Sequence, residues 1–197
     1  MRFTKIPTDT FKSLVINAGV ILKEFDPANP TSDYDANIVG ATSGGVNITA
    51  VPSFTDFGED IDNCPKNMLE LKKIDAWEVK MSGSFITLDA DMTALLLAAA
   101  DSSASSNKVT PRTDLADSDF NDLWFVGDYS DKNGATKGGF AAIKVLNALS
   151  TGGFSLQSTD KGKAKIAFEF TGHVSINAQD AVPFEVYIKA GEAESTG

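Results

Sequence analysis

The sequence predicts a mainly β protein, an antiparallel β-sandwich or barrel-like fold with one flanking α-helix. Strand-like apolar runs occur in both halves of the chain, and several of them alternate apolar with polar residues. One segment, residues 89–101, shows clear helical periodicity. The 197 residues, 42% of them hydrophobic, are enough for one domain with a substantial core. We therefore expect a single domain over residues 1–197.

The first half is expected to contain several strands. Two short apolar strands are predicted at residues 11–16 and 19–23, and a half-buried strand at residues 45–51. Residues 78–88 are typical of one long strand. Within that strand, Gly83 indicates a bulge or a point of close contact with another part of the chain.

Two long, acidic, turn-rich connections separate these strands. The first, at about residues 24–44, contains Pro27 and Pro30 and several aspartates but no lysine or arginine. A connection of this length is expected to lack regular structure. The second connection covers residues 52–67. Residues 68–77 fit either a short helix or an extended segment that leads into the next strand.

The predicted helix at residues 89–101 has a good N-cap in Asp89 or Asp91, and its first turn is acidic, as the helix dipole prefers. Its apolar side chains recur at a spacing of three and four, so this face should lie on a sheet. They are Met92, Leu95, Leu96 and Ala99. Residues 101–122 are expected to form a polar linker or surface loop.

The second half is typical of antiparallel sheet. Apolar runs at residues 123–129 and 138–149 flank Asn133-Gly134, a pair that favours a hairpin. The polar tail at residues 191–197 is expected to be flexible. Further strands are predicted at residues 154–158, 163–176 and 183–189.

Composition argues against several classes of function. The net charge of −10 disfavours non-specific binding to nucleic acid, which needs clustered lysine and arginine. Cys64 is the single cysteine, so no intrachain disulfide forms, and one cysteine with one histidine makes a His/Cys zinc site implausible. The chain has neither a signal peptide nor an apolar run of membrane-spanning length, so we expect a soluble protein made in a reducing cytoplasm.

The sequence contains no recognisable constellation of catalytic residues, so we expect no enzymatic activity, no cofactor and no metal. His173 lies one step off an apolar alternation, where a structural or solvent-facing role is expected. Two acidic clusters lack the spacing of an EF-hand calcium loop and are expected to be solvated. They are Asp117, Asp119 and Asp122, and Asp56, Glu59, Asp60 and Asp62.

Four stretches, taken in order, carry a resemblance to a known family. They read NAGVILKEFDP, IDNCPKNMLELKKIDAWEVKMSGSFITLD, SDFNDLWFVGDYSDKNGATKGGFAAIKVLNALSTGGFSLQ and AFEFTGHVSINAQDAVPFEVYIKAG. In this order they resemble the tail tube (major tail) proteins of long-tailed phages and prophages of Gram-positive bacteria. The similarity is one of text and order rather than a catalytic signature. It extends from about Asn17 to Gly191.

The resemblance implies a phage tail tube fold, a β-sandwich with one flanking helix. It further implies that six copies form a ring whose inner strands close into a barrel, and that rings stack into the tube through which the genome leaves the virion. Implied partners are other copies of the chain and the tape measure, tail terminator and distal tail proteins. DNA would pass through the lumen without specific binding, and the chain itself would bind no membrane. Assembly in the host cytoplasm and a place in the virion tail are implied as well.

Two alternatives remain at this point. Related tubes serve contractile tails and phage-tail-like bacteriocins. A protein of a different class, a monomeric β-sandwich module that binds carbohydrate or calcium through its acidic loops, also fits the composition.

If the protein forms a tube, the long alternating strands suit an inter-subunit sheet, and their polar positions are candidates for the lumen or an interface. The candidates are Glu78, Lys80, Lys165 and Glu169. Because two of the four are lysines, the sequence does not predict a lumen with negative charge alone.

The connection at residues 24–44 is the candidate inter-subunit loop. About twenty flexible residues reach roughly 25 Å, which exceeds a domain radius of gyration of roughly 16 Å. We hypothesise that the loop docks on a neighbouring subunit and orders only on assembly, so that deleting residues 29–42 leaves a folded monomer that forms no tubes. The residues expected to make the contact are Asp26, Pro30, Asp33, Tyr34, Asp35 and Ile38.

Overall fold

The computed structural model describes residues 6–7, 10–103, 105–129 and 138–191. It confirms a mainly β, antiparallel fold with a single α-helix in the part of the chain described. The strands are β1 (Val15–Leu22), β2 (Ile38–Gly40), β3 (Thr42–Asp56), β4 (Lys72–Phe85), β5 (Ala100–Ser103), β6 (Lys108–Pro111), β7 (Asn121–Tyr129), β8 (Gly139–Ser150), β9 (Ser155–Gln157), β10 (Lys165–Thr171) and β11 (Phe184–Lys189). The helix is α1 (Ala90–Leu96), and short 3-10 turns occupy Thr10–Lys12, Asp35–Asn37, Leu69–Leu71, Asp117–Asp119 and Ile176–Ala178.

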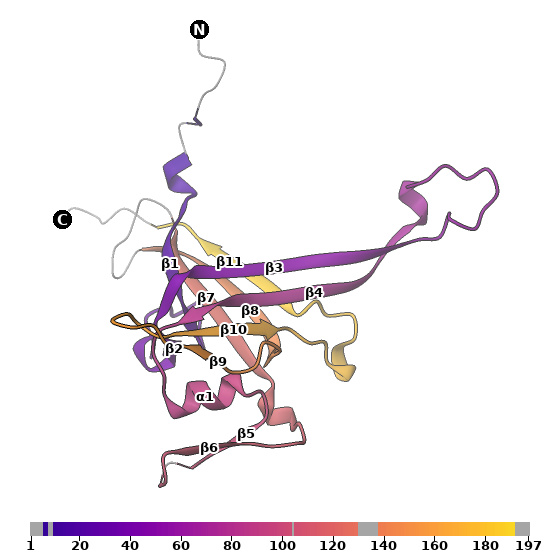
Figure 1. Cartoon of the computed structure of the whole chain (residues 1–197). Helices are drawn as coiled ribbons and strands as arrows, with labels where there is room; N and C mark the ends of the chain where they lie inside the picture. The colour runs from indigo at the N-terminus through magenta and orange to yellow at the C-terminus, as the bar shows by residue number, and fades with distance from the viewer. Residues whose placement is uncertain (1–5, 8–9, 104, 130–137, 192–197) are drawn as a thin grey trace.

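Strand β8 belongs to two sheets. Sheet A has the order β2-β1-β7-β8-β11, and sheet B has the order β9-β10-β4-β3. The end of β8 crosses into sheet B, where Leu149 and Ser150 pair with β10 beside β9. The small β5–β6 hairpin lies apart from both sheets, next to α1 (Figure 1). One continuous strand therefore ties the two layers together.

A β-bulge in β8 makes this crossing possible. Leu146 and Asn147 together oppose the single residue Asp122 on β7, and Asn147 has a φ of 46°. The Asn147 backbone N–H donates to Asp122 Oδ1 at 3.0 Å, and the Asn147 side-chain amide donates to the carbonyl of His173 at 3.0 Å. The bulge therefore has its own hydrogen bonds to both sides.

The main core lies between the two sheets and against α1. Met92 and Leu96 of the helix are buried in it, and the Ser150 hydroxyl donates to the Leu96 carbonyl at 2.8 Å. The remaining buried members of this core are Ile21, Val39, Val79, Met81, Phe85, Leu123, Val145, Ala148, Ile166, Phe168 and Phe170.

A second, smaller core lies on the other face of sheet A. Its members are Leu22, Trp124, Val126, Phe140 and Ala142, packed by Val20, Phe25 and Tyr34. The central strands of sheet A are thus buried on both faces, because the segment that follows β1 folds back over them.

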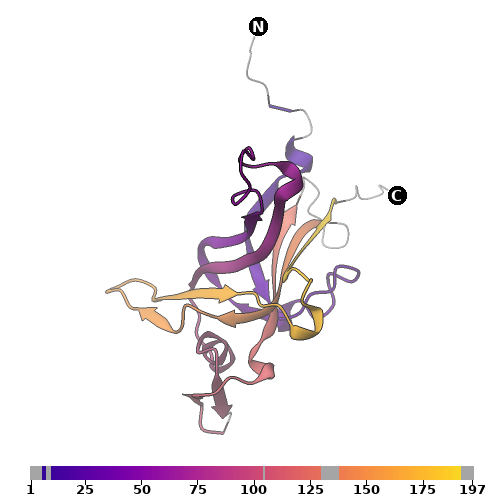
Figure 2. The ribbon, with the colours of Figure 1, turned by 90° about the vertical axis from the view of Figure 1, so that its right-hand side faces the viewer.

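Strands β3 and β4 form a long hairpin that projects from the body of the domain, as Figure 1 shows to the right and Figure 2 shows from its end. Near its base, Gly44 and Gly45 take φ values of 88° and 83° at a register shift in β3. Gly83 of β4 lies opposite, where an added Cβ would come within 2.7 Å of the Phe168 ring. The prediction of a close contact at Gly83 is confirmed, and the bulge lies in the partner strand.

Several predicted boundaries are wrong for identifiable reasons. Residues 15–22 form one strand instead of two. Asn17 and Gly19 adopt positive φ values at a register shift, and β1 pairs with β7 on both sides of that shift. The helix ends at Leu96 instead of residue 101, since Ala98 takes a φ of 64° and the chain turns into β5.

The polar segment predicted as a linker contains the β5–β6 hairpin, and residues 72–77 are extended as part of β4. Strand β10 ends at Thr171 instead of continuing to residue 176. The antiparallel pairing of β7 with β8 is confirmed, whereas the Asn133-Gly134 turn and the tail from residue 192 lie outside the described residues.

The β8 bulge gives a stability prediction. Asn147→Val is expected to lower the free energy of unfolding by about 2–4 kcal/mol. The substitution loses the hydrogen bond from the Asn147 side chain to the His173 carbonyl and places a β-branched residue at positive φ. Asn147→Gly should cost only about 1 kcal/mol, since glycine accepts the backbone conformation and only the side-chain bond is lost. Urea denaturation of both variants tests this, and equal losses would contradict it.

Candidate assembly surfaces

The exposed face of sheet B gathers the four strand residues that the sequence indicated. Residues opposite each other in an antiparallel pair point to the same face, and Lys80 opposes Thr171 while Glu169 opposes Ser82. Glu78 lies two residues before Lys80 on β4, and Lys165 lies four residues before Glu169 on β10. All four side chains therefore lie on the face away from the core, which we call the polar face.

Small neutral side chains make up most of the rest of the polar face. They are Asn47, Thr49, Val51 and Ser53 of β3, Ala76, Ser82 and Ser84 of β4, Ala167 and Thr171 of β10, and Leu149, Thr151, Ser155 and Gln157 along the other edge. Toward the tip of the hairpin the same side carries Thr55, Lys73 and Asp75. With these, the charged residues on this face are three acids and three lysines, so the formal charges cancel.

Lys80 on the polar face is paired with a carboxylate. Lys80 Nζ lies 2.5 Å from Glu78 Oε1. This hydrogen bond and the charges of Glu78 and Glu169 raise the pKa of Lys80. The Thr151 hydroxyl donates to Glu169 Oε1 at 3.2 Å, which orients that carboxylate on the next strand. The cation of Lys80 thus lies in the field of two carboxylates.

Sheet B has an open edge on each side. One edge is β3, which is 15 residues long. The other edge is β9, which is three residues long. Strand β9 and the end of β8 pair with successive parts of β10. Neither edge has a strand partner in the part of the chain described. Exposed backbone donors and acceptors on such edges are templates for pairing with another chain.

The projecting hairpin carries an apolar stripe that continues the core-facing side of β3. Val46, Ile48 and Ala50 pack on the core, and the same side continues to Phe54, which opposes Ile74 across the hairpin. Beyond the body, the described residues leave this stripe about half exposed: Phe54 is 51% exposed and Ile74 is 53% exposed. A contiguous exposed apolar stripe of this kind is typical of an interaction surface.

The tip of the hairpin has a defined shape. Asp56 Oδ1 accepts from the Gly58 N–H at 2.9 Å, and Asp56 Oδ2 accepts from the Asn67 N–H at 3.1 Å. The Phe57 N–H donates to the Leu71 carbonyl at 3.0 Å. The acids of this segment were expected to be solvated, and Asp56 instead closes the loop.

Other apolar side chains are exposed along the hairpin and its tip. They are Val51, Phe57, Ile61, Met68 and Leu69. Lys72 Nζ lies 5.1 Å from the centroid of the Phe54 ring and Lys73 Nζ lies 5.6 Å from that of Phe57, so the lysines shield these rings only in part.

The connection after β1 is folded onto its own domain, which corrects the expectation that it lacks regular structure. The Phe25 ring packs edge-on against Tyr34, Trp124 and Phe140, with centroids 6.3, 5.6 and 5.2 Å apart. Burial, followed by the charges of Asp128 and Asp35, raises the pKa of Tyr34. Tyr34 therefore belongs to the second core of this chain.

Other parts of the connection also serve the domain. Ile38 and its neighbours form β2, and Val39, 4% exposed, belongs to the main core. Deleting residues 29–42 would remove β2 and Val39, so we now expect that deletion to destabilise the monomer itself. Ile38 itself is partly exposed opposite Leu22.

The remaining candidates of the connection shape its turns. Asp26 accepts from the Asn29 side chain at 2.9 Å and from the Ala28 N–H at 2.8 Å, and these bonds lower the pKa of Asp26. Asp33 has a φ of 51°, and Asp35 begins a 3-10 turn. Pro30 lines a groove that also includes Tyr34. The structure brings these residues together as one folded loop; contact with a neighbouring subunit stays a prediction.

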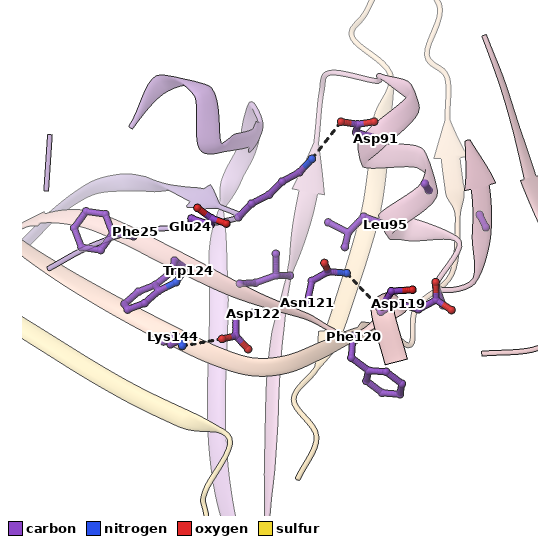
Figure 3. A pocket seen from close by; sticks show the side chains of 16 residues that line it. Glu24, Phe25, Asp91, Leu95, Asp119, Phe120, Asn121, Asp122, Trp124 and Lys144 are labelled. Atoms are coloured by element: carbon purple, nitrogen blue, oxygen red, sulfur yellow. Dashed lines mark hydrogen bonds and ion pairs between the residues drawn. The ribbon is translucent and has the colours of Figure 1, made fainter. Parts of the chain in front are cut away.

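A polar groove of about 720 Å³ lies between α1 and the β7–β8 strands (Figure 3). Lys23 Nζ lies 3.4 Å from Asp91 Oδ2, and Lys144 Nζ lies 2.7 Å from Asp122 Oδ2. Trp124 is only 6% exposed, so it offers no flat aromatic surface on which a sugar would stack. Ion pairs hold the walls of this groove.

The titratable residues singled out near this groove have structural partners. Asp119 pairs with Arg112 and accepts from the Ala116 N–H. His173 Nδ1 lies 3.2 Å from the Asn147 carbonyl, and its ring packs edge-on against Phe120. This places His173 in the structural role that its position in the sequence indicated.

The described residues also bear on metal binding and on membrane insertion. No group of three or more His, Cys, Asp or Glu side chains among them is arranged to hold a metal ion. Within the same residues, none of the helices has the length and apolar character needed to cross a membrane.

Sequence reasoning missed two exposed apolar surfaces. Strand β11 alternates apolar and polar residues, yet Ile188 is 63% exposed and Val186 is also exposed, since β11 pairs only with β8 at the rim of sheet A. The stripe on the hairpin had a signal in Phe54 and Phe57, apolar residues within an acidic, turn-rich connection.

Comparison with known proteins adds no assignment. No protein-family model matches the chain, and no curated protein matches it significantly.

The ion pair on the polar face gives a prediction about titration. Glu78→Gln should lower the pKa of Lys80 toward its ordinary value, because the raised pKa depends first on the hydrogen bond that Lys80 donates to the Glu78 carboxylate. NMR titration of ¹³Cε-labelled lysine measures this. Glu70→Gln, which removes an exposed acid near the tip of the hairpin, is the control and should leave Lys80 unchanged. A Lys80 pKa that is insensitive to Glu78→Gln would contradict the pairing.

Proposed function

We propose that this chain is the tail tube protein of a long-tailed phage or prophage. Six copies form a ring, and rings stack into a tube that conducts the genome during ejection. The observation that carries the proposal is sheet B, which is open at both edges and exposes one face of small polar, charge-balanced side chains. The family resemblance supplies the number of copies and the role.

The dimensions of such a ring support the proposal. Four strand lanes from each of six copies make a barrel of roughly 24 strands, and a spacing of about 4.8 Å at a tilt of about 40° gives a diameter of roughly 48 Å. Side chains that extend about 5 Å inward leave a channel of roughly 38 Å. That channel is wide enough for a DNA duplex. Pairing the β3 edge of one copy with the β9 edge of the next removes both open edges.

The hairpin supplies a second kind of contact. Its apolar stripe extends beyond the body of its own domain, so a neighbouring copy is needed to cover Phe54 and Ile74. The proposal therefore assigns sheet edges to the ring and the hairpin to contacts with further copies. The tape measure, tail terminator and distal tail proteins are the partners that a tube of this kind requires.

The proposal excludes a catalytic role and assigns the protein to the virion tail, after assembly in the host cytoplasm. DNA passes through the lumen without specific binding. Tubes of contractile tails or of phage-tail-like bacteriocins remain within the same proposal, because the surfaces described here serve either. A monomeric binding module has no use for a long exposed hairpin and two open sheet edges, which favours assembly.

Self-assembly tests this function. Phe54→Asp with Ile74→Asp should leave the monomer folded at a total cost of about 1–2 kcal/mol, because both side chains are half exposed while the two carboxylates face each other across the hairpin, and should abolish rings and tubes. Light scattering coupled to size-exclusion chromatography and negative-stain electron microscopy at high protein concentration provide the readout. Leu115→Asp, an exposed apolar residue away from the hairpin, is the matched control and should assemble normally.

Two results would count against the proposal. A wild-type chain that remains monomeric up to its solubility limit would remove the case for a tube. Tubes of normal appearance from the Phe54 and Ile74 double variant would remove the hairpin from the assembly contacts.

A further inference from the structure

Three charged residues lie close together on the polar face. Lys80 lies beside Glu78 on β4, and Glu169 lies diagonally across on β10, opposite Ser82. Lys165 lies at the far end of β10, beyond the last pair that β10 makes with β4. Lys73 and Asp75 lie on the same side of β4 toward the tip of the hairpin, where Lys73 opposes Thr55 and the Thr55 hydroxyl donates to Asp75.

Stability does not account for this arrangement. The Lys80 and Glu78 side chains are both exposed, and ion pairs between exposed side chains contribute little to the free energy of folding. The Thr151 hydroxyl nevertheless bonds both Glu169 and, at 2.8 Å, the Thr171 hydroxyl, so that the second carboxylate is held in place. The cluster therefore calls for an electrostatic explanation.

A free lysine on this face would matter because the wall is repeated. Lysines that neutralise phosphates supply most of the non-specific affinity for DNA. In a wall built from many copies, one exposed ammonium per copy becomes a regular array of phosphate sites. A carboxylate beside each ammonium reduces the field that a phosphate meets.

We infer that Glu78 and Glu169 mask Lys80, so that this lysine does not retain a passing polyanion. The biological purpose of this masking rests on the proposed function. The masking of Lys80 takes place within a single chain, so it can be tested without assembly. Glu78 supplies the direct contact with the ammonium, and Glu169 supplies a second negative charge from the neighbouring strand.

The experiment compares variants of equal net charge. Glu78→Gln with Glu169→Gln changes the formal charge from −10 to −8, and so does the control, Glu59→Gln with Asp60→Asn at the tip of the hairpin. Each unassembled full-length variant is applied to immobilised linear double-stranded DNA at low ionic strength and eluted with rising salt. A third variant adds Lys80→Gln to the first pair.

The first variant should elute at higher salt than the control, and its affinity should fall with salt with a slope larger by roughly 1 for each lysine engaged. Adding Lys80→Gln should return elution to that of the control. Elution of the first variant together with the control would overturn the inference, as would retention that persists without Lys80. The single variants Glu78→Gln and Glu169→Gln, each expected to show a smaller shift, serve if the double variant does not fold.

Failure of this inference is separable from failure of the proposed function. Retention on DNA needs no ring, whereas the tube is judged by electron microscopy of the wild-type chain. Where tubes form, assembly in the presence of short duplex DNA followed by nuclease treatment gives a second readout. Tubes of the first variant should protect several-fold more DNA than control tubes, and equal protection would contradict masking.

Discussion

The bulge at Asn147 is the constraint on which the rest of the structure depends. One strand, β8, serves both sheets because two residues there oppose the single Asp122, which bonds the displaced backbone. Without this change of direction, β10 would have no neighbour in common with β7, and the main core would lose one of its walls. The Lys144–Asp122 ion pair and the hydrogen bond from Asn147 to the His173 carbonyl lie at the same bulge. Asp122 and His173 therefore have structural roles in holding the bulge.

A division of labour between the two sheets follows from this arrangement. The central strands of sheet A are covered on both faces, by the main core and by the folded segment that carries Phe25 and Tyr34. Sheet B is covered on one face only, and its other face is polar. The β3–β4 hairpin then extends sheet B past the body of the domain (Figure 1). There the apolar side of the hairpin, with Phe54 and Ile74, is about half exposed among the described residues. Surfaces available for contact therefore belong mostly to sheet B.

The sequence was most informative where periodicity and burial agree. The alternation of Ile166, Phe168 and Phe170 predicted their burial correctly, and with it the exposed side that carries Lys165 and Glu169. It was least informative where long-range packing decides the outcome. Nothing local distinguishes Tyr34 as a cover for Trp124 from Tyr34 as a contact for another chain. The same holds for β11, whose alternation is regular although its apolar side lies at the surface. Fold class and the polar strand positions could be predicted, whereas the hairpin and the folded loop needed the three-dimensional arrangement.

The unequal edges of sheet B have a consequence for direction. One edge is the long β3 and the other is the short β9, so two copies cannot join these edges through a two-fold axis. In the proposed ring, copies joined edge to edge would all face the same way, and the two rims of the ring would then differ in the residues they present. A stack of such rings would have distinct front and back ends. The proposed tube could therefore start to grow at one end and be stopped at the other by proteins that recognise different surfaces.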